Sequence, residues 1–346
     1  MKKKAWAKHI PLLAVCAAAG VLIAFSPQVK TGIAAGLQLC GETLIPSLFL
    51  FFCLCHLALA YCRQPPRLLA RCYTKLFHLP ANTAMLFLLS LAGGYPMGAL
   101  MCARAVDSGR LPQQQARRLS LFACAAGPAF CILAVGEGMC HSKSIGVFLY
   151  LSNVLAQVLL GCAIGLRYRK EPICKADNLY AENKAFSAAF CEAVEQSISA
   201  MLSVCAYVLL FSVLLQLFSL LPLPQSLVRG IGALLEVTTG CAAFADRVPA
   251  LAFIIGFGGF SVFFQIKKYL QIAGTKASAF LLFRLISGAL GYGIFRLLLW
   301  CFPQSVATLA AGVQVQAFSV SAPLSAVLVM SFAAFILDNK KGKLFQ

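Results

Sequence analysis

Long uninterrupted apolar runs constrain this chain more than any other feature of its sequence. Four of them cover residues 12–25, 44–61, 145–166 and 197–221. They lack the strict alternation of a barrel strand and have the character of membrane helices. Because lipid offers no partner to backbone N–H and C=O groups, such runs cross a membrane as helices. We predict an all-α polytopic membrane protein with about eight to ten transmembrane or re-entrant helices.

Composition excludes a soluble enzyme. Hydrophobic residues make up 60% and charged residues 12% of the 346, against about 45–50% and about 25% in soluble domains. The four histidines are scattered, and neither a GxSxG motif nor a phosphate-binding loop occurs. We therefore expect no catalytic residues and no cofactor.

Charge and cysteine usage fit the membrane interpretation. The net charge of +18 would suggest nucleic acid in a soluble protein, but these basic residues gather in short loops between apolar runs, as the positive-inside rule requires. We therefore expect no nucleic-acid partner. Most of the 16 cysteines lie inside apolar runs, where cysteine acts as a small apolar residue. No CxxC pair or zinc-type Cys/His spacing occurs, so we expect free thiols and no metal site.

Charge patterning also divides the chain. Lysines near the N-terminus and in the tail after residue 339 predict that both termini are cytoplasmic, in a multi-pass protein of the cell membrane. The polar stretch after Leu166 separates two halves. We predict an N-terminal transmembrane helix (1–35), a first half (36–166), a cytoplasmic linker (167–190), a second half (191–300), and a C-terminal helix near 321–337 with a basic tail (301–346).

A basic stretch follows the span near residues 43–62. Arg63, Arg67, Arg71 and Lys75 recur every four residues, so a helix would place them on one face. This spacing predicts a helix on the membrane surface. Its charge either sets topology or binds anionic lipid headgroups.

Two apolar segments are interrupted by glycine pairs, one in each half. The first contains Gly93-Gly94-Tyr95-Pro96-Met97-Gly98 and the second Gly258-Gly259-Phe260-Ser261. Proline removes a backbone donor and glycine adds conformational freedom, so neither segment continues as a regular helix. Paired breaks of this kind are typical of transporter sites, where unwound backbone meets the solute. The alternative is that the glycines only permit close helix packing, as in a GxxxG motif.

The breaks create a conflict in topology. If residues 251–265 cross inward to Lys267 and Lys268, an inverted repeat would leave the basic stretch 104–118 outside, against the positive-inside rule. Three solutions stay open from the sequence. The first broken segment is a re-entrant hairpin, or the two halves are parallel, or a basic stretch lies buried or outside.

Ionisable residues inside apolar segments are expensive, so they mark candidate sites. Glu236 opens the polar cluster Glu236-Val237-Thr238-Thr239-Gly240, which could coordinate a cation or hydrogen-bond a polar solute, or could be a surface loop. Arg284 could face an anionic solute or pair with a glutamate. The candidate substrate-binding residues are Gly93, Gly94, Tyr95, Pro96, Gly98, Glu236, Thr238, Thr239, Gly258, Gly259, Ser261, Gln265 and Arg284.

Several motifs occur in a familiar order. They are Ile45-Pro46-Ser47-Leu48-Phe49, the Gly93–Ala99 block, Gly127-Pro128-Ala129-Phe130, Glu236–Gly240 and Gly256–Val262. With these motifs the chain resembles, over roughly residues 36–299, the sporulation integral membrane proteins of the YlbJ type. That resemblance implies two Gate-like (nucleoside-recognition) repeats, distantly similar to concentrative nucleoside transporters. It also implies transport of a small solute during spore formation, dipicolinate being the substrate associated with the family.

We therefore expect a secondary transporter or facilitator of a small, anionic metabolite such as dipicolinate, located in the cell membrane or the membrane around the forespore. Its expected partners are the solute, membrane lipids, a coupling cation and a second copy of the chain. Two alternatives stay open: a nucleoside or nucleobase permease, which would depend on a cation gradient, and a non-transporting sporulation scaffold in which the glycines only pack helices.

Overall fold

The computed structural model describes residues 2–61, 65–173 and 185–302, and these parts contain helices and no strands. This confirms the all-α prediction. Five segments of the described chain are long and apolar enough to cross a membrane, or six if one bent helix pair is counted as a span. The expected helix near 321–337, the basic tail, Arg63 and residues 174–184 of the predicted linker lie outside the described residues.

The N-terminal part of the chain forms a near-continuous helical run. Helix α1 (Lys2–Ala24) precedes α2 (Ser26–Leu39), which continues through the π-helical turn η1 (Cys40–Leu44) into α3 (Ile45–Tyr61). The π turn lies just before Pro46, which removes a backbone donor from the helix and so interrupts its regular hydrogen bonds. The candidate span therefore covers Ser26–Tyr61, and the expected domain boundary after residue 35 falls inside α2.

Close glycine contacts hold the long helices together. Gly32 and Gly36 let α2 approach α9 (Phe186–Phe218) so closely that a Cβ at Gly32 would lie 2.8 Å from the Val213 Cα. Similarly, α12 (Val248–Phe257) meets α14 (Ala277–Cys301) where Gly256 faces Gly288, with a hypothetical Cβ 2.5 Å from the opposite Cα. Small residues allow this approach because dispersion and packing, not water exclusion, drive helix association in lipid.

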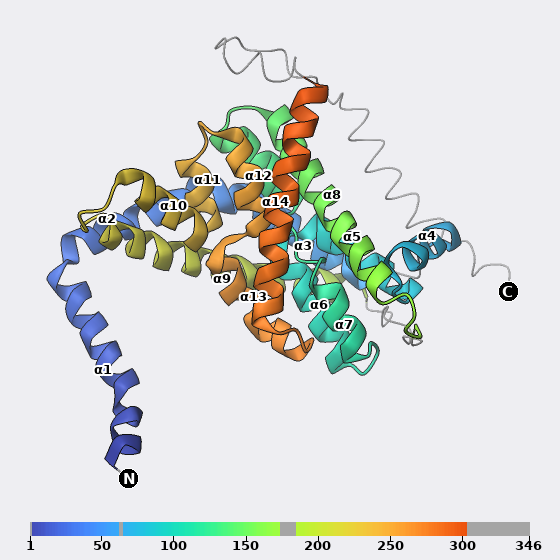
Figure 1. Ribbon diagram of the computed structural model, residues 1–346, viewed down its shortest axis with the longest axis horizontal. Helices are drawn as coiled ribbons and strands as arrows, with labels where there is room; N and C mark the ends of the chain where they lie inside the picture. Colours follow the sequence, from blue (N-terminus) through green and yellow to red (C-terminus); the bar gives the residue numbers. More distant parts are fainter. Residues whose placement is uncertain (1, 62–64, 174–184, 303–346) are drawn as a thin grey trace.

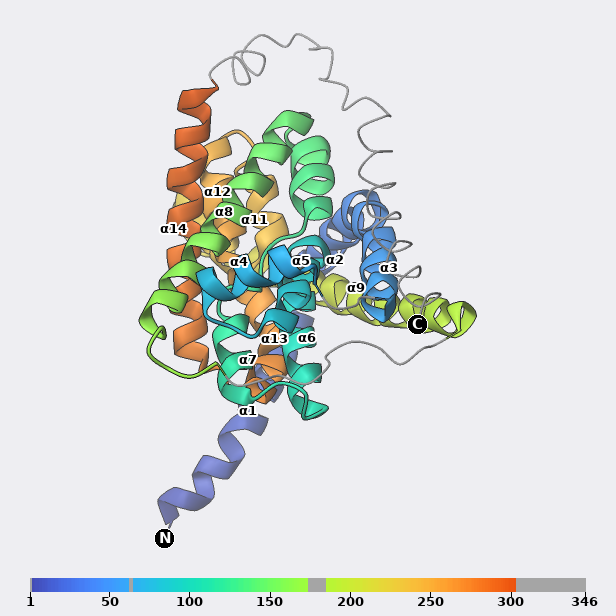
Figure 2. The same ribbon diagram turned by 90° about the vertical axis from the view of Figure 1, so that its right-hand side faces the viewer.

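The long helices do not form a simple parallel bundle. Helix α8 (Lys143–Arg167) packs against α14, and both rise through the body of the molecule, whereas α9 lies across their direction in two perpendicular views (Figures 1 and 2). Helix α1 projects away from the body (Figure 1).

The first broken segment folds back on itself. Helix α5 (Ala84–Gly93) ends at Gly94 and α6 (Tyr95–Asp107) begins directly after it. A Cβ at Gly98 would lie 3.2 Å from the Cβ of Ser90, whereas eight residues of continuous helix would separate them by about 12 Å. The two helices therefore form a hairpin, which is the first of the three solutions that the sequence left open.

The second broken segment continues in one direction. Helices α12 and α13 (Gly259–Ile272) together make a candidate span, Val248–Ile272, interrupted at Gly258. Just before it, α10 (Gln225–Leu235) and the short α11 (Val237–Ala243) are separated by Glu236 in extended conformation. Residues 225–243 therefore form a pair of short helices that Glu236 separates.

One expected span is only partly helical. The apolar run near residues 119–135 predicts one continuous span. In the structure, α7 (Gln113–Ser120) is followed by non-helical chain at 121–127 and then by the π-helix η3 (Ala129–Met139). The prediction of one helix was wrong because the apolar run hid the break at Gly127-Pro128. A Cβ at Gly127 would lie 2.7 Å from the Ala92 carbonyl oxygen, so the non-helical chain lies against the hairpin tip.

The basic loops gather at one end of the molecule. Gln113 of α7 donates a 3.0 Å hydrogen bond to the Ile272 carbonyl at the end of α13, and Ser120 lies 2.6 Å from the hydroxyl of Thr275. The basic stretch 104–118 and Lys267 with Lys268 therefore lie at the same end, which removes the topological conflict. We call this the basic end.

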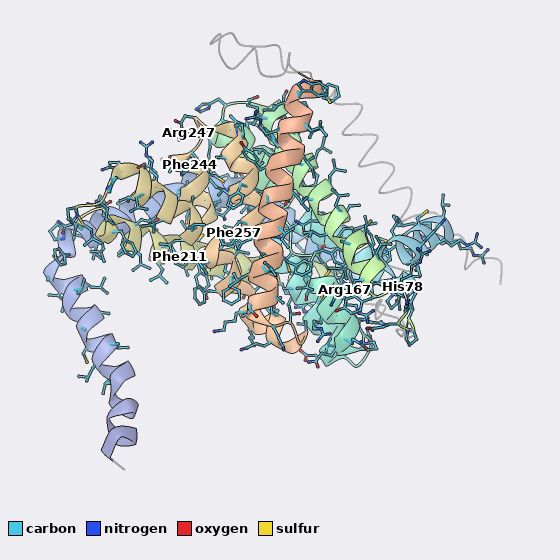
Figure 3. The ribbon with its side chains drawn as sticks, viewed as in Figure 1. His78, Arg167, Phe211, Phe244, Arg247 and Phe257 are labelled. Carbon is cyan, nitrogen blue, oxygen red and sulfur yellow. The ribbon has the colours of Figure 1, made fainter. Side chains whose placement is uncertain are left out.

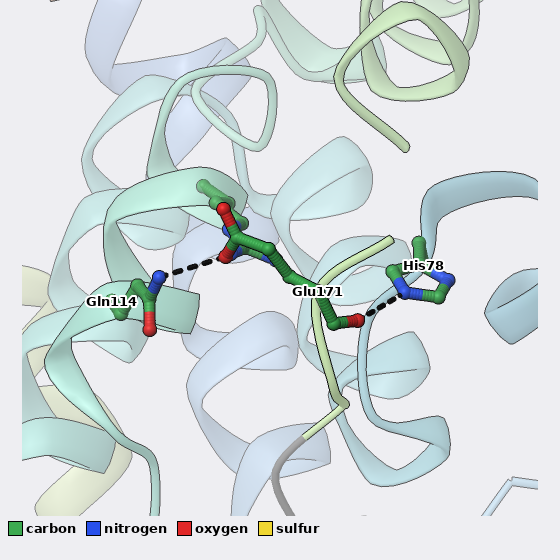
Figure 4. Close-up of polar contacts among 4 residues, drawn as sticks. His78, Gln114 and Glu171 are labelled. Carbon is green, nitrogen blue, oxygen red and sulfur yellow. Dashed lines mark hydrogen bonds and ion pairs between the residues drawn. The ribbon is translucent and has the colours of Figure 1, made fainter. Parts of the chain in front are cut away.

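Glu171 ties three elements together at the basic end (Figure 4). Its carboxylate pairs with Arg118 and accepts a 2.9 Å hydrogen bond from Gln114, both on α7. Its backbone carbonyl lies 2.8 Å from Nε2 of His78, which follows α4 (Arg67–Phe77). Arg247, at the start of α12, lies at the opposite end from His78 and Arg167 (Figure 3).

Helix α4 forms where the four-residue spacing predicted it. Its basic residues Arg67, Arg71 and Lys75 are exposed, whereas Tyr73 and Phe77 are buried against α5 and the residues around Phe122. The prediction of an amphipathic helix is confirmed. Whether it binds lipid headgroups stays a prediction.

Candidate functional site

The two predicted breaks meet in the centre of the protein. Tyr95, the first residue of α6, donates a 2.5 Å hydrogen bond to the carbonyl of Ile255 in the last turn of α12. A Cβ at Gly258 would lie 3.3 Å from the Tyr95 ring, so a side chain at the second break would crowd this ring. Segments 160 residues apart in the chain thus form one structural unit.

A small cavity lies where these breaks meet. Its volume is about 50 Å³. The lining comes from the first break, from Glu236 and the start of α11, and from α3, α9, α13 and η3. It includes the predicted residues Gly93, Gly94, Tyr95, Pro96, Glu236, Thr238 and Gln265. We call this space the central cavity. 

The central cavity is closed in the described conformation. A volume of about 50 Å³ accommodates one or two water molecules or a small ion, whereas pockets for organic ligands usually measure about 300–1,000 Å³. A solute the size of a nucleoside or an aromatic dicarboxylate therefore requires the surrounding helices to move apart.

Glu236 is the acidic group of the central cavity. Its side chain is 1% exposed, and its carboxylate accepts a 2.6 Å hydrogen bond from the Thr239 backbone N–H, which caps α11. Among the described residues no basic side chain forms an ion pair with it. A buried carboxylate without a counter-ion is costly. The surface-loop alternative for Glu236 is thus wrong, because the residue lies in the interior.

Arg284 lies behind the cavity wall and does not line it. Its guanidinium donates to the carbonyls of Phe257 (3.1 Å) and Ile255 (3.4 Å), and also to that of Cys124. Breaks in helices leave such carbonyls without partners, so Arg284 satisfies the backbone at the end of α12 and in the non-helical chain 121–127. The guanidinium also lies 5.4 Å from the centre of the Tyr95 ring.

The remaining predicted residues support the cavity from outside its lining. Gly98 packs against the Ala123 backbone, and Gly259 lies against the backbone of Leu235 and Val237. Ser261 is fully buried, and Thr239 caps back onto the Glu236 carbonyl at 3.2 Å. The structure therefore gathers all thirteen predicted residues around one centre, with about half of them on the cavity surface.

Sequence reasoning missed the apolar part of the lining. Leu44, Leu48 and Phe52 of the α2–η1–α3 run line the cavity together with Phe130 of η3 and Val204 of α9. Apolar residues within apolar helices carry no signal that separates a cavity wall from a lipid-facing surface. Asn153, which donates to the Ala126 carbonyl at 3.1 Å, could have indicated the non-helical chain, because a buried amide needs a partner.

Comparison with known proteins adds one relative. The sporulation integral membrane protein YlbJ of Bacillus subtilis is 26% identical over 311 residues, which cover 77% of this chain and 76% of that protein. The chain is a homologue of YlbJ. The resemblance predicted from the motifs is confirmed at this level, and with its apolar helices the chain is a multi-pass membrane protein. No family model matches the chain. No solved structure matches it either.

Proposed function

We propose that this chain is a membrane transporter whose solute binds in the central cavity after the helices around it separate. The observation that carries the proposal is the junction of two helix breaks around Glu236, a buried acid without a counter-ion. Discontinuous helices supply free backbone groups at membrane depth, which is how many secondary transporters bind solutes and ions.

Two helix N-termini favour an anionic solute. Helices α6 and α13 both begin at the breaks, with Gly94 and Gly258 as the residues before them, and helix N-termini attract negative charge. A small anionic metabolite such as dipicolinate, transported during spore formation, fits this field and follows from the resemblance to the YlbJ type. Glu236 opposes it, so an anion requires that a proton or a coupling cation neutralise this carboxylate.

The cavity lining also favours a second candidate, a nucleoside or nucleobase permease. Glu236, Thr238 and Gln265 can hydrogen-bond a neutral polar solute, and no basic side chain lines the cavity among the described residues. A neutral solute would not require Glu236 to be neutralised.

The distribution of charge gives the orientation that we propose. The basic end carries the stretches 104–118, 167–170 and 267–276, and loops rich in Lys and Arg stay in the cytoplasm. The basic end would therefore face the cytoplasm, in the cell membrane or the membrane around the forespore.

Uptake into proteoliposomes tests the function. Purified full-length protein would be reconstituted and assayed with radiolabelled dipicolinate, with uridine and adenosine as competitors, for the natural chain and Glu236→Gln. Saturable uptake that unlabelled dipicolinate blocks and nucleosides do not would support the anion, and loss of this uptake in Glu236→Gln would support the role of the carboxylate. Competition by nucleosides would favour the permease. Uptake no faster than in empty liposomes, with folding verified, would favour a non-transporting scaffold.

A further inference from the structure

A second, larger space opens at the basic end. It measures about 340 Å³ and lies between α3, α6 and the N-terminal part of α9. We call it the basic groove. Its polar lining includes His56, Arg104, Arg110 and Gln196, and its apolar lining includes Leu86 and Met101. This volume falls within the range of small-molecule sites, unlike that of the closed central cavity.

The basic groove and the central cavity share three helices. On α3, Phe52 lines the cavity and His56 the groove, one helical turn away. Helices α6 and α9 also line both spaces. On α6, Tyr95 lines the cavity and Arg104 the groove. On α9, Val204 lines the cavity and Gln196 the groove. A solute in the groove would therefore be positioned next to the closed cavity.

The charges of the groove favour an anion. Arg104 donates a 3.1 Å hydrogen bond to the Gln196 side chain, which in turn donates a 2.8 Å hydrogen bond to Glu192. The amide of Gln196 thus lies between the arginine and the single acidic residue of the lining. The Arg110 side chain has no hydrogen-bond or ion-pair partner within residues 2–61, 65–173 and 185–302. Two guanidinium groups against one carboxylate leave the groove positive.

Part of the groove lining suits an organic ligand better than an inorganic ion. His56 is 6% exposed, and its Nδ1 is buried without a hydrogen-bond partner among the described residues. Such an atom costs free energy unless it is satisfied. The His56 side chain lines the groove together with Leu86 and Met101, so a ligand with an apolar body could cover these side chains while its anionic group meets the arginines.

We propose that the basic groove binds a small organic carboxylate, whose carboxylate contacts Arg104 and Arg110 and whose body lies against His56 and Met101. The role of the groove as a loading site rests on the proposed transport function, but the binding does not. Arginine suits this task because its planar fork matches a carboxylate.

Equilibrium dialysis tests the binding directly. Full-length protein in nanodiscs of a neutral lipid would be dialysed against radiolabelled dipicolinate, with benzoate, inorganic phosphate or a short-chain phosphatidic acid as competitor. The Arg104→Gln/Arg110→Gln double variant should weaken binding at least about tenfold. Arg71→Gln is the matched control, because Arg71 is an exposed arginine of α4 outside the groove, and it should leave binding unchanged.

A second variant changes volume without changing charge. Ala60 lines the groove and is half-buried, so Ala60→Trp should fill the space and also weaken binding about tenfold. Equal binding by the natural chain and both groove variants, or no binding by the natural chain at millimolar probe, would overturn the proposal. Displacement by phosphate or phosphatidic acid but not benzoate would also overturn it, because the site would then recognise a phosphate.

Glu236→Gln separates this proposal from the proposed function. The groove should still bind dipicolinate in this variant, whereas uptake should be lost. Arginine-dependent binding without uptake by the natural chain would leave the groove standing and overturn transport. If the groove variants altered neither uptake nor binding, the proposed groove site would be overturned and transport would stand.

Discussion

The two broken segments solve the same backbone problem in different ways. The α5–α6 segment turns back at Gly94, and both of its ends point toward the basic end, whereas α12 and α13 continue past Gly258 as one interrupted span. The backbone at the two glycines shows the difference. Gly94 has φ 84° and ψ −171°, a conformation open essentially to glycine alone, while Gly258 has φ 82° and ψ −10°, close to the left-handed helical region. A reversal of chain direction thus restricts the residue type at the break more than a kink does.

The largest expected effect tests the packing of the hairpin. In Gly98→Ala, the new Cβ would overlap the Ala123 carbonyl oxygen, and both are backbone-fixed. We expect the free energy of unfolding to fall by more than about 3 kcal/mol. Size-exclusion chromatography should therefore show little folded protein. Gly293→Ala is the control, since a Cβ there meets nothing within 4 Å. Normal yield and thermal stability of Gly98→Ala would show that the hairpin is not packed against residue 123.

The next effect tests the link between the breaks. Arg284→Met removes the donor that serves Phe257, Ile255 and Cys124. The buried carbonyls would lose their partner, so we expect the free energy of unfolding to fall by about 3 kcal/mol. The measurement is the unfolding temperature in detergent, which should be lower. The unfolding temperature of Arg284→Lys should lie between those of the natural chain and Arg284→Met, because a single ammonium group cannot replace all the hydrogen bonds of the planar guanidinium. A stability of Arg284→Met equal to that of the natural chain would contradict this role.

A paired substitution compares the two glycines directly. Gly94→Ala should cost about 2–3 kcal/mol, because its backbone region excludes side chains, and Gly258→Ala about 1–2 kcal/mol. Asparagine tolerates the left-handed region better than alanine does. Gly258→Asn should therefore lower stability less than Gly258→Ala, unless the Tyr95 ring obstructs the new side chain. Gly94→Asn should still lower stability strongly, because Gly94 lies outside that region. Thermal unfolding of the four variants checks this order. Equal losses at both positions would show that the two breaks are equivalent.

The smallest effect concerns one hydrogen bond. Tyr95→Phe removes the 2.5 Å bond to the Ile255 carbonyl and should cost about 1 kcal/mol, because Arg284 still donates to the same oxygen at 3.4 Å. In the Arg284→Met background the same change should cost more, which a double-mutant cycle on unfolding temperatures would measure. Additive losses would mean that Tyr95 and Arg284 do not share this carbonyl.

Much of the candidate site could be predicted from the sequence. Gly94 beside Pro96, Gly258 beside Gly259, and Glu236 within an apolar stretch are local signals, since each residue type is unfavourable in a continuous membrane helix. The break at 121–127 was less visible, because its residues are apolar and only Gly127-Pro128 interrupts them. The basic groove gave no signal at all, since its lining is drawn from α3, α5, α6, α9 and the loop after α6.

The sequence by itself determined that the chain is a helical membrane protein and where its helices break, because hydrophobicity and backbone preferences act over a few residues. Only the tertiary structure decided that the first break reverses while the second continues, that Tyr95 meets Ile255, and that Arg284 serves carbonyls instead of the cavity. The last two outcomes depend on hydrogen bonds between residues 160 positions apart, and the first depends on how the helices beside each break pack. None of these contacts follows from the order of residues along one helix.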